Sequence, residues 1–487
     1  MNVPFNNSYV ELPGRFYSRQ LPSPVAKPHL IRVNHDLAHK LNIDPDWIDS
    51  ADAISTFAGN HVPEGADPIA TVYAGHQFGS WNPQLGDGRA VLLGEVIGTD
   101  GQRYDIQLKG SGQTPYSRMG DGRAPLGPVL REYIVSEAMA ALGIATSRSL
   151  AAVTTGEPVF REESLPGAVL VRVASSHIRI GTVQFFSAQN DVEGLRLLID
   201  HVITRHYPEV QEADNPTLAL LDKVMQRQAE LIASWQMVGF IHGVMNTDNM
   251  LLSGETIDYG PCAFMDTYDP ETVFSSIDHG GRYAYQNQPG IAHWNLACLA
   301  QALVPLLATS EEEAVEIAKQ ALDRFPAYFL AANLTGLRGK LGLTSEQEAD
   351  ETLAKDFLEL LKEHQLDFTL AFRRLSELAG DEVEYSVKSL VGFPSTFDDW
   401  LSRWQKRCSE EQQVSRQANM LVTNPAIIPR NHLIEAAIVA ATNDDNFDPF
   451  HQLVDHLSSP FDLSGVDLDY AKRPRPEQVV RQTFCGT

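Results

Sequence analysis

A helix, a polar loop and an Asp-aromatic-Gly turn follow one another in the middle of the chain. Apolar periodicity predicts a long amphipathic helix over 218–238, and the loop His242-Gly-Val-Met-Asn-Thr-Asp-Asn249 comes soon after it. Two short strands, 250–252 and 256–257, are expected next, before Asp258-Tyr-Gly. An Asn amide oxygen and an Asp carboxylate are hard oxygen ligands suited to a Mg²⁺ ion that bridges phosphates. The order therefore predicts a nucleotide and Mg²⁺ site, with Asn249 and Asp258 as the metal ligands.

This order of elements is that of a protein-kinase active site, with one residue changed. The catalytic Asp of a kinase loop stands two residues after the His, and Val244 occupies that position here. A valine side chain cannot accept a proton, so two alternatives stay open. Either the site is catalytically inactive, or Asp248, beside Asn249, takes the role of the base.

A lysine at the end of a strand supplies a positive charge for such a site. The runs 90–96 and 104–109 are predicted strands joined by the turn 98–101, and Lys109 ends the second of them. A Gly- and Pro-rich loop, 110–127, follows. Lys109 can thus project an ammonium group into a cleft that holds phosphates; the alternative is a solvated lysine on a sheet edge.

The next helix offers two partners for that lysine. Pro128 is expected to open a helix that ends near Gly143, with Pro at the start and Gly past the end. Glu132 and Glu137 both lie on it, about 140° apart around the helix axis, so they do not face the same way. Apolar periodicity favours Glu137 on the buried face, but it does not decide which glutamate meets Lys109.

Glycines and arginines complete the candidate site. Gly86 and Gly88 lack a Cβ atom, so backbone N–H groups there can approach a phosphate, and Arg89 adds a charged fork. The alternative is a simple tight turn. Arg172 and Arg179 lie in apolar stretches, where an arginine serves either an anionic ligand or an internal salt bridge.

The pattern of elements predicts an α+β fold with two lobes of the protein-kinase-like type. We expect an N-terminal extension over 1–65, a sheet-rich nucleotide-binding lobe over 66–190, a helical lobe with the catalytic and metal-binding loops over 191–400, and a helical extension and tail over 401–487. The runs 168–173 and 178–186 are predicted strands within the first lobe.

Composition narrows the partners. The formal net charge is −25, which repels phosphate backbones and argues against nucleic acid as a partner. No continuous apolar run approaches the roughly 20 residues of a membrane span, and the N-terminus does not have the pattern of a signal peptide.

The four cysteines lie far apart, so neither a zinc ribbon nor a disulfide framework is expected. We therefore expect a cytoplasmic protein with no membrane partner. His35-Asp-Leu-Ala-His39 imitates a zinc helix, but we expect a solvated helix there.

Long strings of residues carry a resemblance to a known family. They are Tyr73-Ala-Gly-His-Gln-Phe-Gly79, Gln84-Leu-Gly-Asp-Gly-Arg89, Leu108-Lys-Gly-Ser-Gly-Gln-Thr-Pro-Tyr-Ser-Arg118, Gly120-Asp-Gly-Arg123 and the block His242–Pro261. With them the chain resembles the selenoprotein O family, also called the YdiU family, of protein adenylyltransferases. The resemblance is dense over about residues 70–300 and looser elsewhere.

The resemblance implies a kinase-like fold that binds ATP inverted and passes AMP to Ser, Thr or Tyr hydroxyls of proteins, with Mg²⁺ or Mn²⁺ as cofactor and UMP transfer from UTP as a further possibility. It implies that Asp248 is the proton acceptor, that Glu132 is the partner of Lys109, and that Asn249 and Asp258 hold the metal. The implied nucleotide contacts are Gly86, Gly88, Arg89, Lys109, Asp121, Gly122, Arg172, Arg179 and Asp258.

Three functions remain in competition. An AMP transferase is the leading hypothesis; a kinase-like phosphotransferase and a nucleotide-binding pseudoenzyme acting as scaffold or sensor are the alternatives. Val244 argues against ordinary kinase chemistry, whereas Asp248, Asn249 and Asp258 together argue against an inactive site. Cys485 stands third from the end, where animal members of the family carry selenocysteine. The resemblance implies a redox role for it, and a free thiol is the alternative.

Overall fold

One antiparallel sheet organises the N-terminal part of the computed structural model, which describes residues 2–411 and 414–484. The strand order is β1-β3-β6-β7-β10-β9-β2, and β8 pairs with β10 off this path. The strands are β1 (Tyr17–Arg19), β2 (His29–Val33), β3 (Ile69–Thr71), β6 (Ala90–Ile97), β7 (Arg103–Lys109), β8 (Ala124–Pro125), β9 (Arg148–Phe160) and β10 (Ser164–Ala174). Two small ribbons pair β4 (Gly75–Gln77) with β5 (Ser80–Asn82) and β11 (Phe240–Ile241) with β12 (Ala263–Phe264).

The sheet separates two hydrophobic cores, and strand alternation decides which side chains enter each. Val169, Val171 and Val173 of β10 pack into the core beneath the short helices α1 (His35–Lys40) and α2 (Ala51–Phe57). Leu170, of opposite parity, packs into the core shared with α3 (Leu126–Ala141). Arg172 has the parity of Leu170, and its neighbour in register on β7 is Gln107. Alternation thus brings a charged side chain to the α3 face of the sheet.

Most of the predicted elements around the sheet are confirmed. The runs 90–96, 104–109 and 168–173 fall within β6, β7 and β10. The helix expected from Pro128 is α3, which begins two residues earlier, at Leu126. Gly143 lies just beyond its end with a φ of +78°, the left-handed conformation that suits glycine after a helix.

The strand predicted over 178–186 is wrong: this segment enters the helix α4 (Ile180–Ala188). Its residues Ile180 to Gln184 are all buried, polar ones included, because α4 packs against β4, α5 (Val192–His206) and α7 (Gln288–Leu307). A helix buried on nearly every side has no polar face, and its sequence therefore lacks the 3.6-residue period.

The two short strands predicted over 250–252 and 256–257 are also wrong as a pair. Leu251 forms an isolated bridge with Arg179, and Thr256 forms one with Thr146. The ribbon at this place is β11–β12, on either side of the loop and the Asp258 turn. Hydrogen bonds to distant segments, which local pattern does not report, fix residues 250–257.

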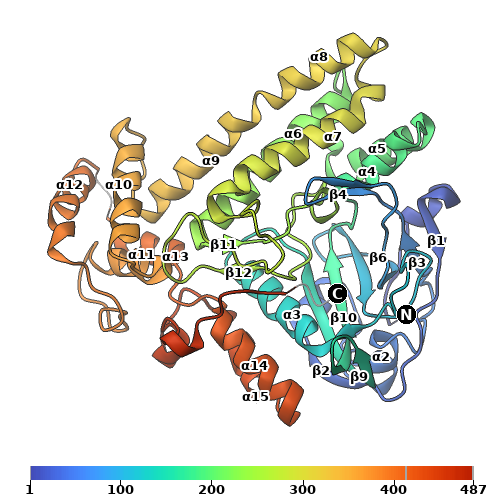
Figure 1. Ribbon diagram of the computed structural model, residues 1–487, viewed down its shortest axis with the longest axis horizontal. Coiled ribbons are helices and arrows are strands. Elements are labelled where there is room, and N and C mark those ends of the chain that lie inside the picture. The colour runs from blue at the N-terminus through green and yellow to red at the C-terminus, as the bar shows by residue number, and fades with distance from the viewer. Residues whose placement is uncertain (1, 412–413, 485–487) are drawn as a thin grey trace.

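The C-terminal part is helical, as predicted. Figure 1 shows α6 (Pro216–Val238), α7 and α9 (Phe325–Lys340) side by side, in agreement with their mutual contacts. The helix predicted over 218–238 is α6. The other helices are α8 (Glu311–Leu322), α10 (Ala349–Glu363), α11 (Phe368–Glu377), α12 (Asp398–Ser409), α13 (Arg416–Thr423), α14 (Asn431–Asp444) and α15 (Asp448–Leu457). Helices α14 and α15 return to the N-terminal part and pack on α3. The division into lobes at 66–190 and 191–400 stays a prediction.

One segment, Tyr285–Leu307, is long and apolar enough to cross a membrane by length and composition. It contains α7, whose Leu296, Leu299 and Leu303 belong to the large hydrophobic core. The helix packs against α4, α6 and α8, so in this fold its apolar character is that of a core helix.

Candidate active site

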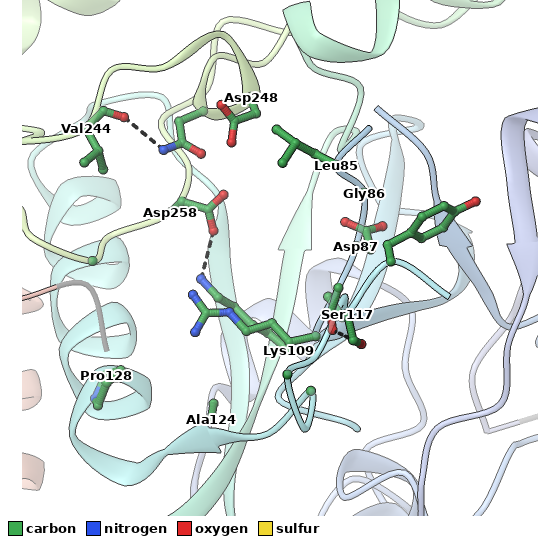
Figure 2. Close-up of a pocket in the computed structure, with 18 of the residues that line it drawn as sticks. Leu85, Gly86, Asp87, Lys109, Ser117, Ala124, Pro128, Val244, Asp248 and Asp258 are labelled. Atoms are coloured by element: carbon green, nitrogen blue, oxygen red, sulfur yellow. Dashed lines mark hydrogen bonds and ion pairs between the residues drawn. The ribbon is translucent and has the colours of Figure 1, made fainter. Parts of the chain in front are cut away.

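A cavity of about 790 Å³ opens between the sheet, helix α3 and the loop that follows α6. Its size is within the range of small-molecule sites in proteins. All the residues predicted for the site line it, namely Gly86, Gly88, Arg89, Lys109, Asp121, Gly122, Glu132, Arg172, Arg179, Asp248, Asn249 and Asp258. Figure 2 shows Asp248 and Asp258 on one wall, Gly86 and Asp87 on the opposite wall, and Lys109 between them.

Lys109 joins the sheet to α3 and to the Asp258 turn. Its Nζ lies 2.5 Å from Oε2 of Glu132 and 2.8 Å from Oδ1 of Asp258. Glu137 faces elsewhere, with 2.6 Å between its Oε2 and Nη2 of Arg148. The structure therefore pairs Lys109 with Glu132, the glutamate that the family resemblance implies, and not with the one that periodicity favours.

Two buried arginines complete the charge cluster. Nη1 of Arg172 is 2.7 Å from Oδ1 of Asp258 and 3.2 Å from Oε1 of Glu132. Nη1 of Arg179 is 2.8 Å from Oδ2 of Asp258. Both arginines thus form internal salt bridges, one of the two alternatives that the sequence left open for them. Nη2 of Arg179 also lies 3.8 Å from Oδ1 of Asp87, so three cations face three carboxylates at the floor of the cavity.

These cations keep Asp258 ionised. Burial alone would raise its pKa, but Lys109, Arg172 and Arg179 hold that pKa well below the ordinary value of an aspartate. Asp258 has a φ of +64°, a left-handed conformation that is uncommon for a residue other than glycine. Such a conformation persists only where surrounding contacts favour it, and the three ion pairs provide those contacts.

The loop after α6 brings its polar residues to the cavity. His242 is buried, and its Nε2 lies 2.9 Å from the carbonyl oxygen of Ile257, which ties the loop to the Asp258 turn. Nδ2 of Asn249 donates to the carbonyl oxygen of Val244 at 2.9 Å. Within residues 2–411 and 414–484, no hydrogen bond reaches Oδ1 of Asn249, so this oxygen remains available to a ligand.

Asp248 is a buried carboxyl group at the cavity wall, with 7% of the residue exposed. Nε2 of Gln77 donates to its Oδ2 at 3.0 Å, and its Oδ1 has no hydrogen-bond partner among the described residues. Burial raises the pKa of Asp248 to about 6, although Gln77 and Arg179 act in the opposite direction. Such a pKa suits a group that exchanges a proton near neutral pH.

Glycines form the wall opposite the loop. A Cβ atom on Gly86 would lie 2.5 Å from the ring of Tyr116, and one on Gly122 would lie 2.1 Å from the carbonyl oxygen of Gly112. Only glycine fits at these points, and the backbone there borders the cavity directly. Arg89 forms no ion pair within the described ranges, whereas Asp121 pairs with Arg161, with 2.8 Å between Oδ2 and Nη1.

The donor set fits a divalent metal in its chemistry. Asn249 offers an unbonded amide oxygen and Asp258 an ionised carboxylate, the oxygen ligands that Mg²⁺ and Mn²⁺ prefer. The described residues hold no group of three or more His, Cys, Asp or Glu side chains arranged for a metal. A site with two protein ligands, completed by phosphates and water, is the usual form for Mg²⁺ in nucleotide enzymes.

Comparison with known proteins gives the family. A model of the family described as "Protein adenylyltransferase SelO" matches residues 1–458. The "Protein nucleotidyltransferase YdiU" of Rhodopseudomonas palustris (strain BisB5) is 60% identical over 490 residues, which cover 100% of both chains. The protein of the same name from Bradyrhizobium sp. (strain ORS 278) is 57% identical over 489 residues, again with 100% of both chains covered. The chain belongs to the SelO family.

Membership confirms the resemblance drawn from the sequence strings and makes the chain an enzyme, a nucleotidyltransferase. The cavity described above contains every residue that the SelO resemblance assigned to the site.

Sequence reasoning missed three polar residues of this SelO-family site. Gln77 forms a hydrogen bond with Asp248. Gln107 accepts a hydrogen bond from Arg172, with 2.6 Å between Oε1 and Nη2. Oδ1 of Asp87 lies 3.8 Å from Nη2 of Arg179. Gln107 was within reach of sequence reasoning, because it stands two positions before Lys109 on the same strand face. Gln77 and Asp87 meet their partners across 171 and 92 positions, and no local signal reports such contacts. Cys485 lies outside the described residues.

Proposed function

We propose that this enzyme transfers AMP from ATP to Ser, Thr or Tyr hydroxyls of proteins. The observation that carries the proposal is the presence in one cavity of three cations, Lys109, Arg172 and Arg179, together with a buried carboxyl group at Asp248 and a valine at the kinase base position. The family's description as an adenylyltransferase and the relatives' names as protein nucleotidyltransferases support the same reading.

In the proposed reaction Asp248 is the base. The acceptor hydroxyl loses its proton to the Asp248 carboxylate while its oxygen bonds to the α-phosphorus of ATP. The bond from that phosphorus to the bridging oxygen breaks, and pyrophosphate leaves with the electron pair. Lys109, Arg172 and Arg179 stabilise the negative charge on the phosphates. Val244 has no atom that accepts the proton, so the kinase position contributes no base.

Asn249 and Asp258 are the residues that would hold Mg²⁺ or Mn²⁺. The ion supplies neutralisation of phosphate charge when it is bound. Because Asp258 already meets three cations, we expect nucleotide binding to redistribute these ion pairs, so that Lys109 and the arginines turn partly to phosphate.

We further propose that the two parts form a protein-kinase-like fold with ATP inverted relative to kinases. Support comes from the order of the elements: a Lys on β7, a Glu on α3, a His-initiated loop after a long helix, and an Asp in a left-handed turn. The inverted orientation is what would place the α-phosphate, and not the γ-phosphate, toward Asp248.

Isotope position tests the function. The protein is incubated with Mg²⁺ and with casein as acceptor, in parallel with ATP labelled at the α- or the γ-phosphate, and protein-bound label is measured. Label from the α-position is expected in casein or in the enzyme itself. Stable γ-label without α-label would establish a phosphotransferase, and nucleotide binding without either label would establish a pseudoenzyme. A parallel reaction with α-labelled UTP shows whether UMP is also transferred.

A further inference from the structure

Strand β4 and the residue that follows it lie along the loop 242–249 and form hydrogen bonds with three of its residues. The backbone N–H of His76 donates to Oγ1 of Thr247 at 2.7 Å, and that of Phe78 donates to Oδ1 of Asn246 at 3.0 Å. Between them, Nε2 of Gln77 donates to Oδ2 of Asp248 at 3.0 Å. Three consecutive residues at the β4 end of one hairpin thus hold three consecutive residues of the loop, although 168 to 171 positions separate each pair.

Gly75, at the start of β4, lets the hairpin approach this closely. A Cβ atom at residue 75 would lie 2.9 Å from Oδ1 of Asp248 and 3.1 Å from its Cβ. Oδ1 is therefore packed against the hairpin backbone and is hidden from solvent. Oδ2 is the oxygen that Gln77 holds, and both Gln77 and Asp248 line the cavity.

The hairpin is itself anchored to α4. Nε2 of Gln184, on α4, lies 3.0 Å from Nδ1 of His76. The N–H of Ala74 donates to the carbonyl oxygen of Gly181, also on α4, at 2.9 Å. Helix α4 begins directly after Arg179, whose Nη1 donates to the carbonyl oxygen of Asp248 at 2.6 Å. The support behind Gln77 therefore continues to Arg179, at the floor of the cavity.

We propose that Gln77 is a positioning residue for the transfer reaction: it fixes the rotation of the Asp248 carboxylate. A carboxylate oxygen has two lone pairs, so Oδ2 can accept from Gln77 and from an acceptor hydroxyl together. A hydrogen bond to the charged form is the kind that is worth most, and a base held in one rotamer needs no reordering before proton transfer. This inference rests on the proposed role of Asp248 as the base.

The variant Gln77→Met removes the amide donor at similar volume. It is compared with Gln84→Met, the same change at an exposed position just beyond the hairpin. With α-labelled ATP, Mg²⁺ and casein, kcat is expected to fall about tenfold or more in Gln77→Met, while calorimetric ATP binding stays within about twofold of the parent. Gln84→Met is expected to match the parent in both. If Gln77→Met does not fold, Gln77→Leu, which also removes the amide donor and adds no charge, carries the same test.

The double variant with Asp248→Asn separates positioning from general support. If Gln77 acts through Asp248, adding Gln77→Met to Asp248→Asn costs no further rate. An unchanged kcat in Gln77→Met, or a further tenfold loss in the double variant, overturns the inference while leaving the proposed function intact. Full activity in Asp248→Asn alone would overturn the base role itself, and the positioning role with it.

Discussion

Two aspartates ten positions apart have opposite surroundings, which suit the different roles proposed for them. Asp258 meets three cations, which keep its pKa low, whereas Asp248 is buried with one amide donor and has a pKa raised to about 6. A carboxylate that is always ionised suits metal and charge binding. One with a pKa near neutrality suits proton transfer.

Asn substitution of each aspartate is predicted to have a different effect. Asp248→Asn should lower transfer of α-label about 10²-fold and leave ATP–Mg²⁺ affinity near that of the parent, because only the base is lost. Asp258→Asn should abolish transfer and weaken ATP–Mg²⁺ binding at least about tenfold, because the metal-binding charge is lost. Calorimetric titration of ATP with Mg²⁺, run beside label transfer, measures both. Equal loss of ATP affinity in the two variants would contradict this division of roles.

Gln substitution of the two glutamates on α3 is also predicted to have two different effects. Glu132→Gln should lower transfer about tenfold, because Lys109 and Arg172 each lose one of their two charged partners. Glu137→Gln should leave transfer unchanged but lower the free energy of unfolding by about 1–3 kcal/mol, because its bonds to Arg148 and the Ser149 N–H weaken. Label transfer and urea denaturation of both variants provide the test. Loss of transfer in Glu137→Gln alone would reverse the assignment.

The family strings predicted residues that all line one cavity, and local periodicity did not choose between these glutamates. The reason is the burial of α3: every residue from Val129 to Ser136 is buried, including Arg131 and Glu132. A helix without an exposed face gives no apolar stripe against which to place a charged residue. The family resemblance implied Glu132, and the ion pair from Lys109 of β7 to α3 identifies it in the structure.

At the scale of elements, prediction succeeded where one face is buried and one is exposed. Helix α6 has a clear periodicity and was predicted within two residues. Helix α4 and the bridges at Leu251 and Thr256 were misread, because their conformation depends on segments far away in the chain. These misread elements border the active site: α4 follows Arg179, and Leu251 bridges to that same arginine. Local pattern is least informative there because polar groups are buried against distant partners.

The glycine loop around Gly122 gives a prediction at this scale. Gly122 has a φ of +68°, and a Cβ atom there would lie 2.1 Å from the backbone oxygen of Gly112. Gly122→Ala should therefore displace the loop from the cavity and lower ATP affinity about tenfold or more, with little change in overall helix content. Gly392→Ala is the control, since a Cβ atom there meets nothing within 4 Å. ATP titration calorimetry and circular dichroism measure the two effects, and unchanged affinity in Gly122→Ala would contradict the loop's role.

At the scale of the whole molecule, the C-terminal helices contact the elements that carry the residues lining the cavity. Arg131 of α3, next to Glu132, donates through Nη1 to Oδ1 of Asn431 at 2.8 Å and pairs with Glu435. Both partners belong to α14, which begins directly after the buried Arg430. Arg430 is 2.8 Å from Asp367 and also pairs with Asp266, eight positions after Asp258. The C-terminal extension therefore braces both α3 and the segment that follows the Asp258 turn.

The helical part also contains a charge without a partner. Lys340, at the end of α9, is 2% exposed, and its Nζ lies 4.2 Å and 5.4 Å from the ring centres of Phe372 and Phe368. No carboxylate forms an ion pair with it in the ranges that the structure describes. Burial lowers the pKa of Lys340 to about 7. The aromatic rings offset part of the cost of burying the charge, and the rest destabilises the fold.

This lysine makes the stability of the molecule depend on pH. Below pH 7 Lys340 is protonated in both states, and the folded state bears the whole cost of the buried charge. Between pH 7 and about 10.5 the unfolded state binds a proton that the folded state has lost, so the free energy of unfolding rises with pH.

Lys340→Met removes the charge at similar length. It should stabilise the protein by on the order of 4 kcal/mol at pH 6, and by about 2 kcal/mol at pH 9. Lys406→Met, at an exposed position, is the control and should change stability by less than about 0.5 kcal/mol at either pH. Urea denaturation of the three proteins at both pH values measures these differences. A gain in Lys340→Met that is the same at pH 6 and pH 9 would show that Lys340 keeps its proton in the folded protein at both pH values, and so that its pKa is not lowered by burial.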